Sequence, residues 1–355
     1  MNEVGLDALR EKLDNIDNEV LKLINERMEI VHQVGVVKAH SGGAIYRPER
    51  EKSIIDRLES LNTGKLNRAA IEALFLEIFA ISRNLELPEN VAYLGPEGSF
   101  THQAAEARFG AMSSYVSISS IKGIFREVDT KKARFGVVPI ENSSNGIVTD
   151  TINCLNTYNL KIIAEVVLDI HHTLASTCDK IEDIKRIYSK DIAFEQCRKF
   201  LTNFGLDEIE HIPIESTTKA AKIAFNEAGS AAICPHVGAK LHNLPILFEN
   251  IEDKDNNKTR FFIISNFENA QSGNDKTSIL VTLSDKQGAL VEFLTDFNKV
   301  NINLTKIKSH IVEGNSIFFI DFDGHKDDDN VKDVLEKYKD NVKILGSYVK
   351  EINDI

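Results

Sequence analysis

Few of the features that mark redox, metal or membrane proteins occur in this 355-residue chain. Its only cysteines are Cys154, Cys178, Cys197 and Cys234, and no two form a CxxC pair or stand at the spacing of a metal site. No apolar run approaches the roughly 18 residues that a membrane-spanning helix needs. The first residues also lack the apolar core of a signal peptide. These absences predict reduced thiols, no metal, no membrane anchor and a cytoplasmic location.

Positive charge is also scarce, and no glycine-rich nucleotide loop or low-complexity tract is present. The chain has 42 Lys and Arg against 54 Asp and Glu, a net charge of −12, so nucleic acid and anionic membranes are not expected partners. A local group of arginines can still bind an anionic substrate. The length predicts two or three domains. A proline-containing break at 87–90 and a polar stretch at 269–275 divide the chain into expected domains at 1–88, 90–268 and 276–355.

The first segment predicts a long amphipathic helix that carries cations at unusual places. Apolar residues recur at helical spacing from Leu6 to about Lys38. At about 100° and 1.5 Å per residue, Arg27 and Lys38 lie about 20° and 16 Å apart, so they can hold one small dianion between them. Arg10 lies about 25 Å from Arg27 and is rotated by about 100°, too far to reach the same ligand. If Arg10 serves a ligand, that ligand belongs to another subunit. The alternative interpretation is a coiled-coil arm with a solvated charged face.

Two further helices follow this one. Glycines at 42–43 end the first helix, Pro48 starts the second, and a third apolar pattern runs over about 67–87. The order of polar residues along this three-helix unit resembles the all-helical chorismate mutases. The matching residues are Arg10, Arg27, Lys38, Arg50, Glu51, Ser82 and Glu86.

This resemblance implies a rearrangement of chorismate to prephenate in which the enzyme holds a dicarboxylate in a compact shape and stabilises charge on the ether oxygen. It implies that Arg27, with Arg10 from the partner subunit, binds carboxylates. Lys38 and Glu86 are the implied catalytic groups at the ether oxygen. Relatives often have Gln where this chain has Glu86, and a carboxylate there must be protonated to act. The resemblance further implies that the ring hydroxyl and the ligand's position are fixed by Glu51, Arg50 and Ser82.

The middle segment alternates short β-rich runs with helical patterns, which predicts α/β layers with parallel strands. Strands are expected at 91–94, 135–140, 161–168, 187–189, 231–234 and 261–265, and helices near 99–108, 119–129, 194–203 and 216–228. Polar clusters follow several of these strands, where open α/β sheets place their ligands. Each cluster on its own can also be a capped helix start without a ligand.

Taken together, the polar clusters resemble prephenate dehydratase over about 90–268. The motifs are Gly95-Pro96 with Gly98-Ser99-Phe100, the run from Val138 to Ser143, Gln196-Cys197, and Thr259-Arg260-Phe261. The family often has Ser-His-Pro where this chain has Ser189-Lys190-Asp191. The resemblance implies a two-lobed α/β fold like that of periplasmic binding proteins.

The implied chemistry is the loss of water and carbon dioxide from prephenate to give phenylpyruvate. The ring hydroxyl is a poor leaving group and needs a proton, and the carboxylates need a cation. By the motif, Thr259 is the catalytic donor or orienter and Arg260 binds a carboxylate. Other residues implied in the same cleft are Ser99, Glu141, Asn142, Ser143, Thr217 and Phe261.

The last segment predicts the order βαββαβ, a ferredoxin-like α+β domain. Its first helix starts with Gly288-Ala289-Leu290-Val291, which resembles the ligand-binding turn of ACT regulatory domains. In dehydratases of this kind the domain binds phenylalanine between two subunits. The second family signature, usually Glu-Ser-Arg-Pro, is Lys308-Ser309-His310-Ile311 here, so only Ser309 matches. The alternative is a tail that only dimerises.

The sequence therefore predicts a multi-domain, bifunctional enzyme of phenylalanine biosynthesis. We expect chorismate and prephenate as substrates, phenylalanine as a feedback effector, no cofactor, and a homodimer or higher homo-oligomer. One alternative is a dehydratase whose N-terminal helices are a non-catalytic dimerisation arm. The other is a non-catalytic amino-acid sensor, since two-lobed clefts and ACT domains also occur in binding proteins.

Overall fold

The computed structural model describes residues 5–41, 47–86, 90–254, 256–284, 286–312 and 315–350, and only the backbone of residues 38–41, 86, 312 and 315. The chain separates into two compact units. The first comprises residues 1–89 and 109–114, and the second comprises residues 90–108 and 115–355.

The first unit is the expected set of three helices: α1 (Leu6–Ser41), α2 (Pro48–Leu61) and α3 (Arg68–Glu86). Pro48 occupies the first turn of α2, where the absent N–H costs no hydrogen bond. The small core of this unit consists of Ile55, Ile71 and Phe79, which are all buried. The predicted three-helix pattern is thus confirmed.

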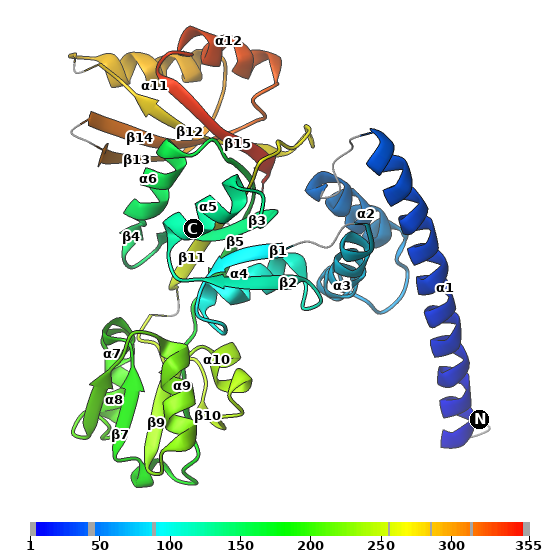
Figure 1. Ribbon diagram of the computed structural model, residues 1–355, viewed down its shortest axis with the longest axis vertical. Coiled ribbons are helices and arrows are strands. Elements are labelled where there is room, and N and C mark those ends of the chain that lie inside the picture. The colour runs from blue at the N-terminus through cyan, green and yellow to red at the C-terminus, as the bar shows by residue number, and fades with distance from the viewer. Residues whose placement is uncertain are drawn as a thin grey trace. The chain divides into compact units, whose positions relative to one another are not determined.

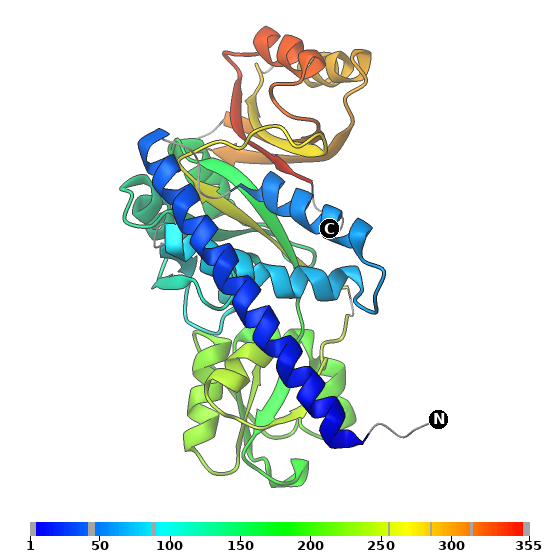
Figure 2. The ribbon, with the colours of Figure 1, turned by 90° about the vertical axis from the view of Figure 1, so that its right-hand side faces the viewer.

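The first helix keeps most of its apolar stripe in solvent. Figure 2 shows α1 as one continuous helix. The exposed fraction lies between 46 and 64% for each of Leu6, Leu9, Leu13, Ile16 and Leu23. An apolar stripe of this length is larger than the scattered exposed residues of a monomer and is typical of a surface that another chain covers.

The second unit contains three sheets (Figure 1). The first lobe has the strand order β2-β1-β3-β11-β5, with β4 beside β3. Its elements are β1 (Asn90–Leu94), α4 (Phe100–Phe109), β2 (Ser114–Ile118), α5 (Ile121–Asp129), β3 (Phe135–Asn142), β4 (Gly146–Ile147), α6 (Thr149–Thr157), β5 (Lys161–Asp169) and β11 (Lys258–Ser265).

The second lobe is an insertion between β5 and β11, so the chain crosses between the lobes twice. Its strand order is β10-β6-β9-β7-β8. The elements are β6 (Thr173–Ser176), the 3₁₀ helix η1 (Ile181–Asp183), β7 (Arg186–Ser189), α7 (Asp191–Gln196), α8 (Arg198–Asn203), β8 (Glu210–Pro213), α9 (Thr217–Asn226), β9 (Ser230–Cys234), α10 (His236–Leu241) and β10 (Ile246–Phe248).

The expectation of parallel strands holds for only part of these sheets. Strand β1 pairs with β3, and β7 with β8 and β9, in parallel. Strand β11 runs antiparallel to both of its neighbours, β3 and β5, and β6 is antiparallel to β9 and β10. The reason is the two crossings: β11 returns from the second lobe in the direction opposite to that in which β5 entered it.

The C-terminal domain has the expected βαββαβ order. It consists of β12 (Asp275–Thr282), α11 (Ala289–Lys299), β13 (Leu304–Val312), β14 (Asn315–Asp323), α12 (Asp329–Lys337) and β15 (Val342–Val349). The four strands are antiparallel in the order β13-β14-β12-β15. Figure 1 shows both helices on one face of this sheet, and that face is filled by residues such as Phe293, Phe297 and Phe322.

The other face of the C-terminal sheet packs on the first lobe. Leu280, Phe319 and Tyr348 of the C-terminal strands belong to one continuous core with Phe262 and Ile264 of β11. The backbones of β15 and β5 approach so closely that a Cβ at position 346 would lie 2.1 Å from the carbonyl oxygen of Ile162, which only Gly346 avoids. The first lobe and the C-terminal domain therefore share a core.

Candidate functional site

The helical unit brings two of the predicted site residues together. The guanidinium Nη1 of Arg27 donates to Ser82 Oγ at 2.5 Å, and Ser82 Oγ donates to the carbonyl of Ile78 at 2.6 Å. Arg27 also lies 5.8 Å from the centre of the Phe79 ring. These contacts hold Arg27 at a fixed place between α1 and α3.

Other predicted residues of this unit lie in different surroundings. Glu51 accepts from Arg83, a buried cation that sequence reasoning missed and that also donates to the carbonyl of Phe109 at 3.1 Å. Arg50 is exposed. Arg10 is exposed near the start of α1, where it pairs with Asp7 at 3.3 Å. The side chains of Lys38 and Glu86 lie outside the described residues, so their predicted roles remain predictions.

In the first lobe, Thr259 is held by the amide of Asn142. Asn142 Nδ2 donates to Thr259 Oγ1 at 2.8 Å and to Asn257 Oδ1 at 2.9 Å. Asn142 Oδ1 accepts from the backbone N–H groups of Ser144 and Asn145. Because the amide donates to Oγ1, the hydroxyl hydrogen of Thr259 remains available to a ligand. This is the arrangement that a hydrogen-bond donor to a leaving hydroxyl requires.

The turn that follows β3 is tied to the start of β11. The hydroxyl of Ser143 accepts from the backbone N–H of Lys258 at 2.9 Å and donates to the carbonyl of Asn256 at 3.2 Å. Asn257 links this turn to Asn142, although no role was predicted for it. The hydrogen bonds of Asn142 and Ser143 thus fix the strand start that carries Thr259, at the point where the chain returns from the second lobe.

Arg260 lies on the opposite side of the same strand. Arg260 is 2% exposed, and its guanidinium donates to Glu165, to Asp321 at 2.6 Å and to the hydroxyl of Tyr348 at 3.0 Å. Successive side chains of a strand point to opposite faces, so Thr259 and Arg260 cannot both line one cleft. The structure does not bring Arg260 into the site with Thr259, and its guanidinium is fully occupied by these partners.

Glu141 behaves in the same way. It is paired with Arg260 across the strands, and its carboxylate binds Lys306 and, at 3.5 Å, Lys308 of β13. Burial alone would raise the pKa of Glu141, but the two ammonium groups outweigh burial and hold that pKa below its usual value. The side chain of Glu141 therefore faces the C-terminal domain rather than the cleft.

Of the three other predicted cleft residues, Ser99 and Phe261 have local structural roles. Ser99 Oγ donates to the carbonyl of Leu94 at 2.9 Å and accepts from the N–H of His102 at 3.3 Å, so it caps α4. Phe261 is 1% exposed and belongs to the core. Thr217 is the first residue of α9 and is partly exposed.

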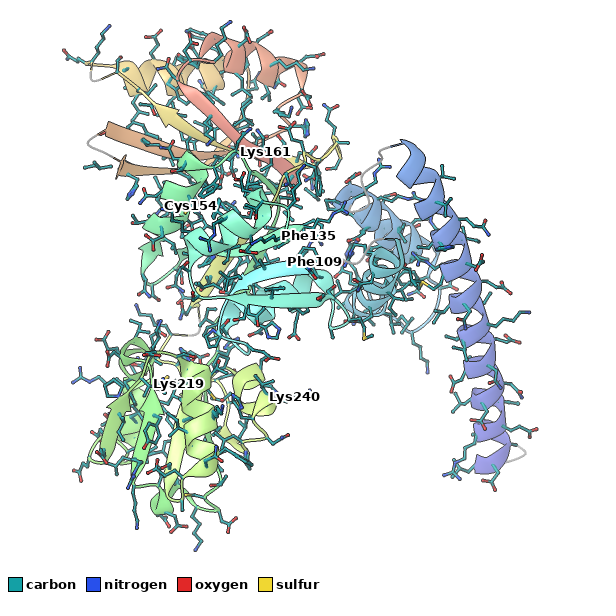
Figure 3. The ribbon with its side chains drawn as sticks, in the orientation of Figure 1. Phe109, Phe135, Cys154, Lys161, Lys219 and Lys240 are labelled. Carbon is teal, nitrogen blue, oxygen red and sulfur yellow. The ribbon has the colours of Figure 1, made fainter. Side chains whose placement is uncertain are left out.

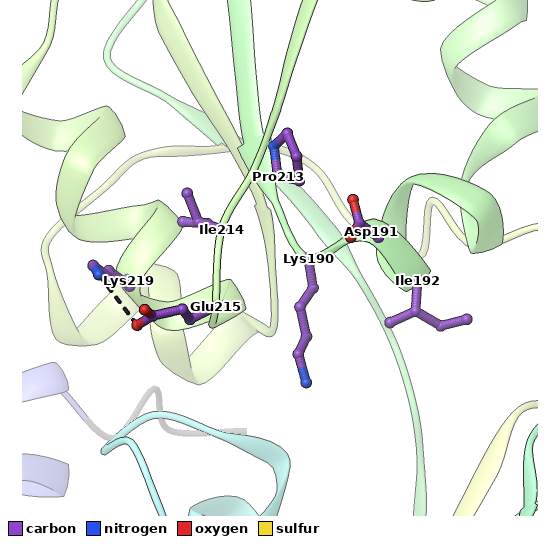
Figure 4. Close-up of a pocket in the computed structure, with 7 residues that line it drawn as sticks. All are labelled: Lys190, Asp191, Ile192, Pro213, Ile214, Glu215 and Lys219. Atoms are coloured by element: carbon purple, nitrogen blue, oxygen red, sulfur yellow. Dashed lines mark hydrogen bonds and ion pairs between the residues drawn. The ribbon is translucent and has the colours of Figure 1, made fainter.

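A pocket of about 760 Å³ lies in the second lobe, within the size range of small-molecule sites. It lies at the carboxyl ends of the parallel strands β7 and β8, beside the first turn of α9. Its lining residues are Lys190, Asp191, Ile192, Pro213, Ile214, Glu215 and Lys219 (Figure 4). Figure 3 places Lys219 at the end of the second lobe that is nearer the first lobe.

The turn of α9 beside this pocket contacts the first lobe. A Cβ at Gly98 of the first lobe would lie 2.9 Å from Thr218 Cγ2 of α9, and Gly98 has a φ of +78°. The ring of Phe100 in α4 contacts His172 of the first crossing, at 5.7 Å between ring centres. The loop after β1 thus contacts the α9 turn that carries Thr217 and Lys219.

Gln196 contacts the first crossing, and Cys197 is buried in the core of the second lobe. Gln196 Oε1 lies 2.9 Å from His172 Nε2, and burial lowers the pKa of His172 below its usual value. Burial also raises the pKa of the Cys197 thiol, so it is not a reactive thiolate.

The predicted effector turn has the expected backbone. Gly288 adopts φ 85°, a left-handed conformation, directly before α11, and only glycine does this without strain. Val291 is 67% exposed, and Ser309 on β13 is exposed. Ala289 and Leu290 form the partly buried start of the helix.

Within the described ranges, no group of three or more His, Cys, Asp or Glu residues has the arrangement of a metal site. Of the helices in those ranges, none combines the length and apolarity needed to cross a bilayer.

Comparisons with known proteins agree with this division of the chain. The prephenate dehydratase family matches residues 91–269, and the family of type II chorismate mutases matches residues 9–87. The bifunctional chorismate mutase/prephenate dehydratase of Aquifex aeolicus is 38% identical over 98% of both chains. The protein of the same description from Pseudomonas aeruginosa is 40% identical, also over 98% of both chains.

A solved structure shares the fold of the larger unit. The crystal structure of prephenate dehydratase from Arthrobacter aurescens in complex with L-Phe covers 74% of this chain, and 90% of that chain is matched. The TM-score is 0.67 at 33% sequence identity.

Proposed function

The chain belongs to the bifunctional chorismate mutase/prephenate dehydratase family, and from this membership we propose how its residues carry out the two reactions. It is an enzyme of phenylalanine biosynthesis with both activities. Chorismate is rearranged to prephenate, which is then dehydrated and decarboxylated to phenylpyruvate. The proposed domains are the mutase at 1–88, the dehydratase at 90–268 and the regulatory domain at 276–355.

For the dehydratase, the observation that supports the proposal most directly is the hydrogen bond from Asn142 to Thr259. The amide orients Oγ1, and the threonine hydroxyl donates to the ring hydroxyl as it leaves. Departure of that hydroxyl and loss of the ring carboxylate as carbon dioxide then give the aromatic product. Ser143 keeps the strand start in place, and Thr217 lies on the second-lobe side of the cleft. Membership of this enzyme family decides against the non-catalytic amino-acid sensor, which would also not need a donor oriented in this way.

The test separates the two reactions. Thr259→Ala should abolish nearly all phenylpyruvate formation and leave the conversion of chorismate to prephenate unchanged, because the two sites are in separate units. Thr259→Ser keeps the hydroxyl and should retain partial dehydratase activity. Full dehydratase activity in Thr259→Ala would refute the assignment, and loss of both activities would show that the variant has lost its fold.

For the mutase, we propose a site built across a dimer. Arg27 and Ser82 form the part contributed by one chain, with Lys38, Arg50, Glu51 and Glu86 as predicted further members. Arg10 completes the site of the partner, because α1 carries it far from Arg27. The exposed apolar stripe of α1 supports a partner helix along its length. If the helices were only a dimerisation arm, the fragment 1–88 would lack mutase activity.

For regulation, we propose that phenylalanine binds the C-terminal domain at Gly288–Val291, with Ser309 from β13. The left-handed Gly288 leaves the first N–H groups of α11 free of a side-chain cap, as a ligand carboxylate requires. The four cysteines are unpaired, which supports the proposed cytoplasmic location.

A further inference from the structure

The dehydratase cleft needs a cation, and Arg260 does not provide it. Prephenate carries two carboxylates, and the proposed site would leave them without an ionic partner. Arg260 is already bound by two buried carboxylates, Glu165 and Asp321. Lys258, two residues earlier on the same face of β11, pairs with Asp169 at 3.8 Å. The strand that carries Thr259 therefore turns its cations away from the cleft.

We propose that Lys190, at the end of β7 in the second-lobe pocket, binds the side-chain carboxylate of prephenate, with Lys219 as a secondary cation. This rests on the proposed dehydratase function. Lys190 follows Ser189, whose hydroxyl is buried and donates to the carbonyl of Ile233 at 2.7 Å. The lysine is thus attached to a fixed strand end, while its own side chain is exposed.

Lys190 is the cation of this pocket that is available to bind a ligand carboxylate, because the other charged groups of the pocket do not pair with it. Glu215 and Lys219 pair with each other at 3.3 Å, and Figure 4 shows the carboxylate of Asp191 on the opposite side from the Lys190 ammonium. In the described part of the chain, no ion pair or hydrogen bond engages that ammonium. The Lys219–Glu215 pair is exposed, 55 and 86% at the two side chains. Such pairs contribute little, so Lys219 can exchange Glu215 for a ligand carboxylate.

The position of the pocket is suitable for this role. The carboxyl ends of β7 and β8 are where α/β sheets place their ligands. The neighbouring turn of α9 contacts Gly98 of the first lobe through Thr218. Thr259 also lies where the chain crosses between lobes, so the donor and the cation are contributed from the two sides of one boundary.

The chemistry decides which carboxylate Lys190 binds. The ring carboxylate must release its electron pair into the ring as carbon dioxide leaves, and an ammonium bound to it would stabilise the charge that the reaction has to disperse. The side-chain carboxylate keeps its charge throughout and is still present in phenylpyruvate. A cation on that carboxylate anchors the substrate without opposing the reaction.

The experiment compares Lys190→Met, Lys190→Arg and a control, Lys180→Met, in the full-length protein. Lys180 is an exposed lysine before η1, at the opposite end of β7. Removing a charge-assisted hydrogen bond predicts a rise in the KM for prephenate on the order of 10- to 100-fold in Lys190→Met, with a much smaller change in kcat. Lys190→Arg should restore most of the affinity. Lys180→Met should match the unmodified protein, and mutase activity should be equal in all variants.

Product inhibition provides the second measurement. The inhibition constant of phenylpyruvate should rise with the KM, because the product retains the bound carboxylate. An unchanged inhibition constant beside a raised KM would overturn the assignment to the side-chain carboxylate. An unchanged KM in Lys190→Met, with normal dehydratase turnover in the unmodified protein, would overturn the role of Lys190 and leave the proposed function intact. Failure of the unmodified protein to form phenylpyruvate would refute the proposed function itself.

Discussion

Glu165→Gln should destabilise the larger unit by several kcal/mol. Glu165 is 0% exposed and accepts from Arg260 at 2.7 Å and from Lys276 at 2.8 Å. Asp321 accepts from Arg260 at 2.6 Å and from Ser278 at 2.5 Å. Two cations and two carboxylates thus neutralise one another in a nearly dry interior. Glutamine has the same shape but no charge, so the change leaves a net positive charge and creates no cavity.

The magnitude follows from the burial of the group. Removing one partner of a buried ion pair typically costs about 3–5 kcal/mol, because the charge left behind stays desolvated. For a unit of this size that corresponds to a fall in melting temperature of about 6–20 °C. The double variant Glu165→Gln/Lys276→Met removes one charge of each sign. It should recover part of the loss, and the cycle of the two changes measures their coupling.

A control for this prediction exists in the same unit. Glu268 also binds two lysines, Lys161 at 3.1 Å and Lys326 at 3.0 Å, but its side chain is 43% exposed. Glu268→Gln should therefore cost less than about 1 kcal/mol. Urea unfolding followed by circular dichroism would compare the variants; the chain has no tryptophan for fluorescence. Equal losses of stability in Glu165→Gln and Glu268→Gln would refute the argument from burial.

Three further predictions test the other parts of the chain. Arg10→Ala and Arg27→Ala dimers should each be poor mutases. Subunit exchange between them should restore roughly a quarter of normal activity, because half the dimers are then mixed and each mixed dimer has one intact site of two. No recovery after confirmed exchange would refute a site across the dimer. Phenylalanine should inhibit the dehydratase and raise its melting temperature, and Gly288→Val should abolish both effects; calorimetry that shows no binding to the unmodified protein at millimolar phenylalanine would exclude the sensor. Burial lowers the pKa of His172 below the usual histidine value of about 6.5. Near and below pH 6.5 the unfolded chain therefore binds more protons than the folded chain, and stability should fall as the pH decreases through that value. His172→Gln should reduce the dependence of stability on pH, and an unchanged dependence would contradict the argument.

The helices of the first unit and the elements of the C-terminal domain were predictable from local sequence. Apolar residues at helical spacing marked the first unit, and short apolar, β-rich runs between helical patterns marked β12 to β15. In the dehydratase lobes, the short strands β2, β4, β6, β8 and β10 were missed. They have two to five residues each, too few for a pattern to stand out. The antiparallel course of β11 depends on the insertion of the second lobe, which no local pattern reveals.

The buried ionic cluster is marked in the sequence by charged residues inside strand segments. Glu165 stands in the middle of the apolar run of β5, and Asp321 stands in a similar run in β14, whereas Lys276 lies in the polar first half of β12. A charge inside a buried strand requires a partner of opposite sign. Which residues pair is decided by the packing of two sheets that are distant in the sequence, and for that reason the structure was needed.

The motif Thr259-Arg260 shows most clearly how one strand serves two purposes. As neighbours in the amino-acid sequence, the two residues suggest one site that contains both a hydrogen-bond donor and a cation. Once they lie in a strand, alternation assigns them to opposite faces, and the same alternation separates Asn142 from Glu141 on the paired strand β3. Thr259 and Asn142 form one hydrogen-bonded pair, whereas Arg260 and Glu141 form ionic contacts with Asp321, Lys306 and Lys308 of the C-terminal domain. The residues next to the proposed donor are thus held by the proposed regulatory domain, and a shift of β13 or β14 would act first on Arg260 and Glu141, the direct chain neighbours of Thr259 and Asn142.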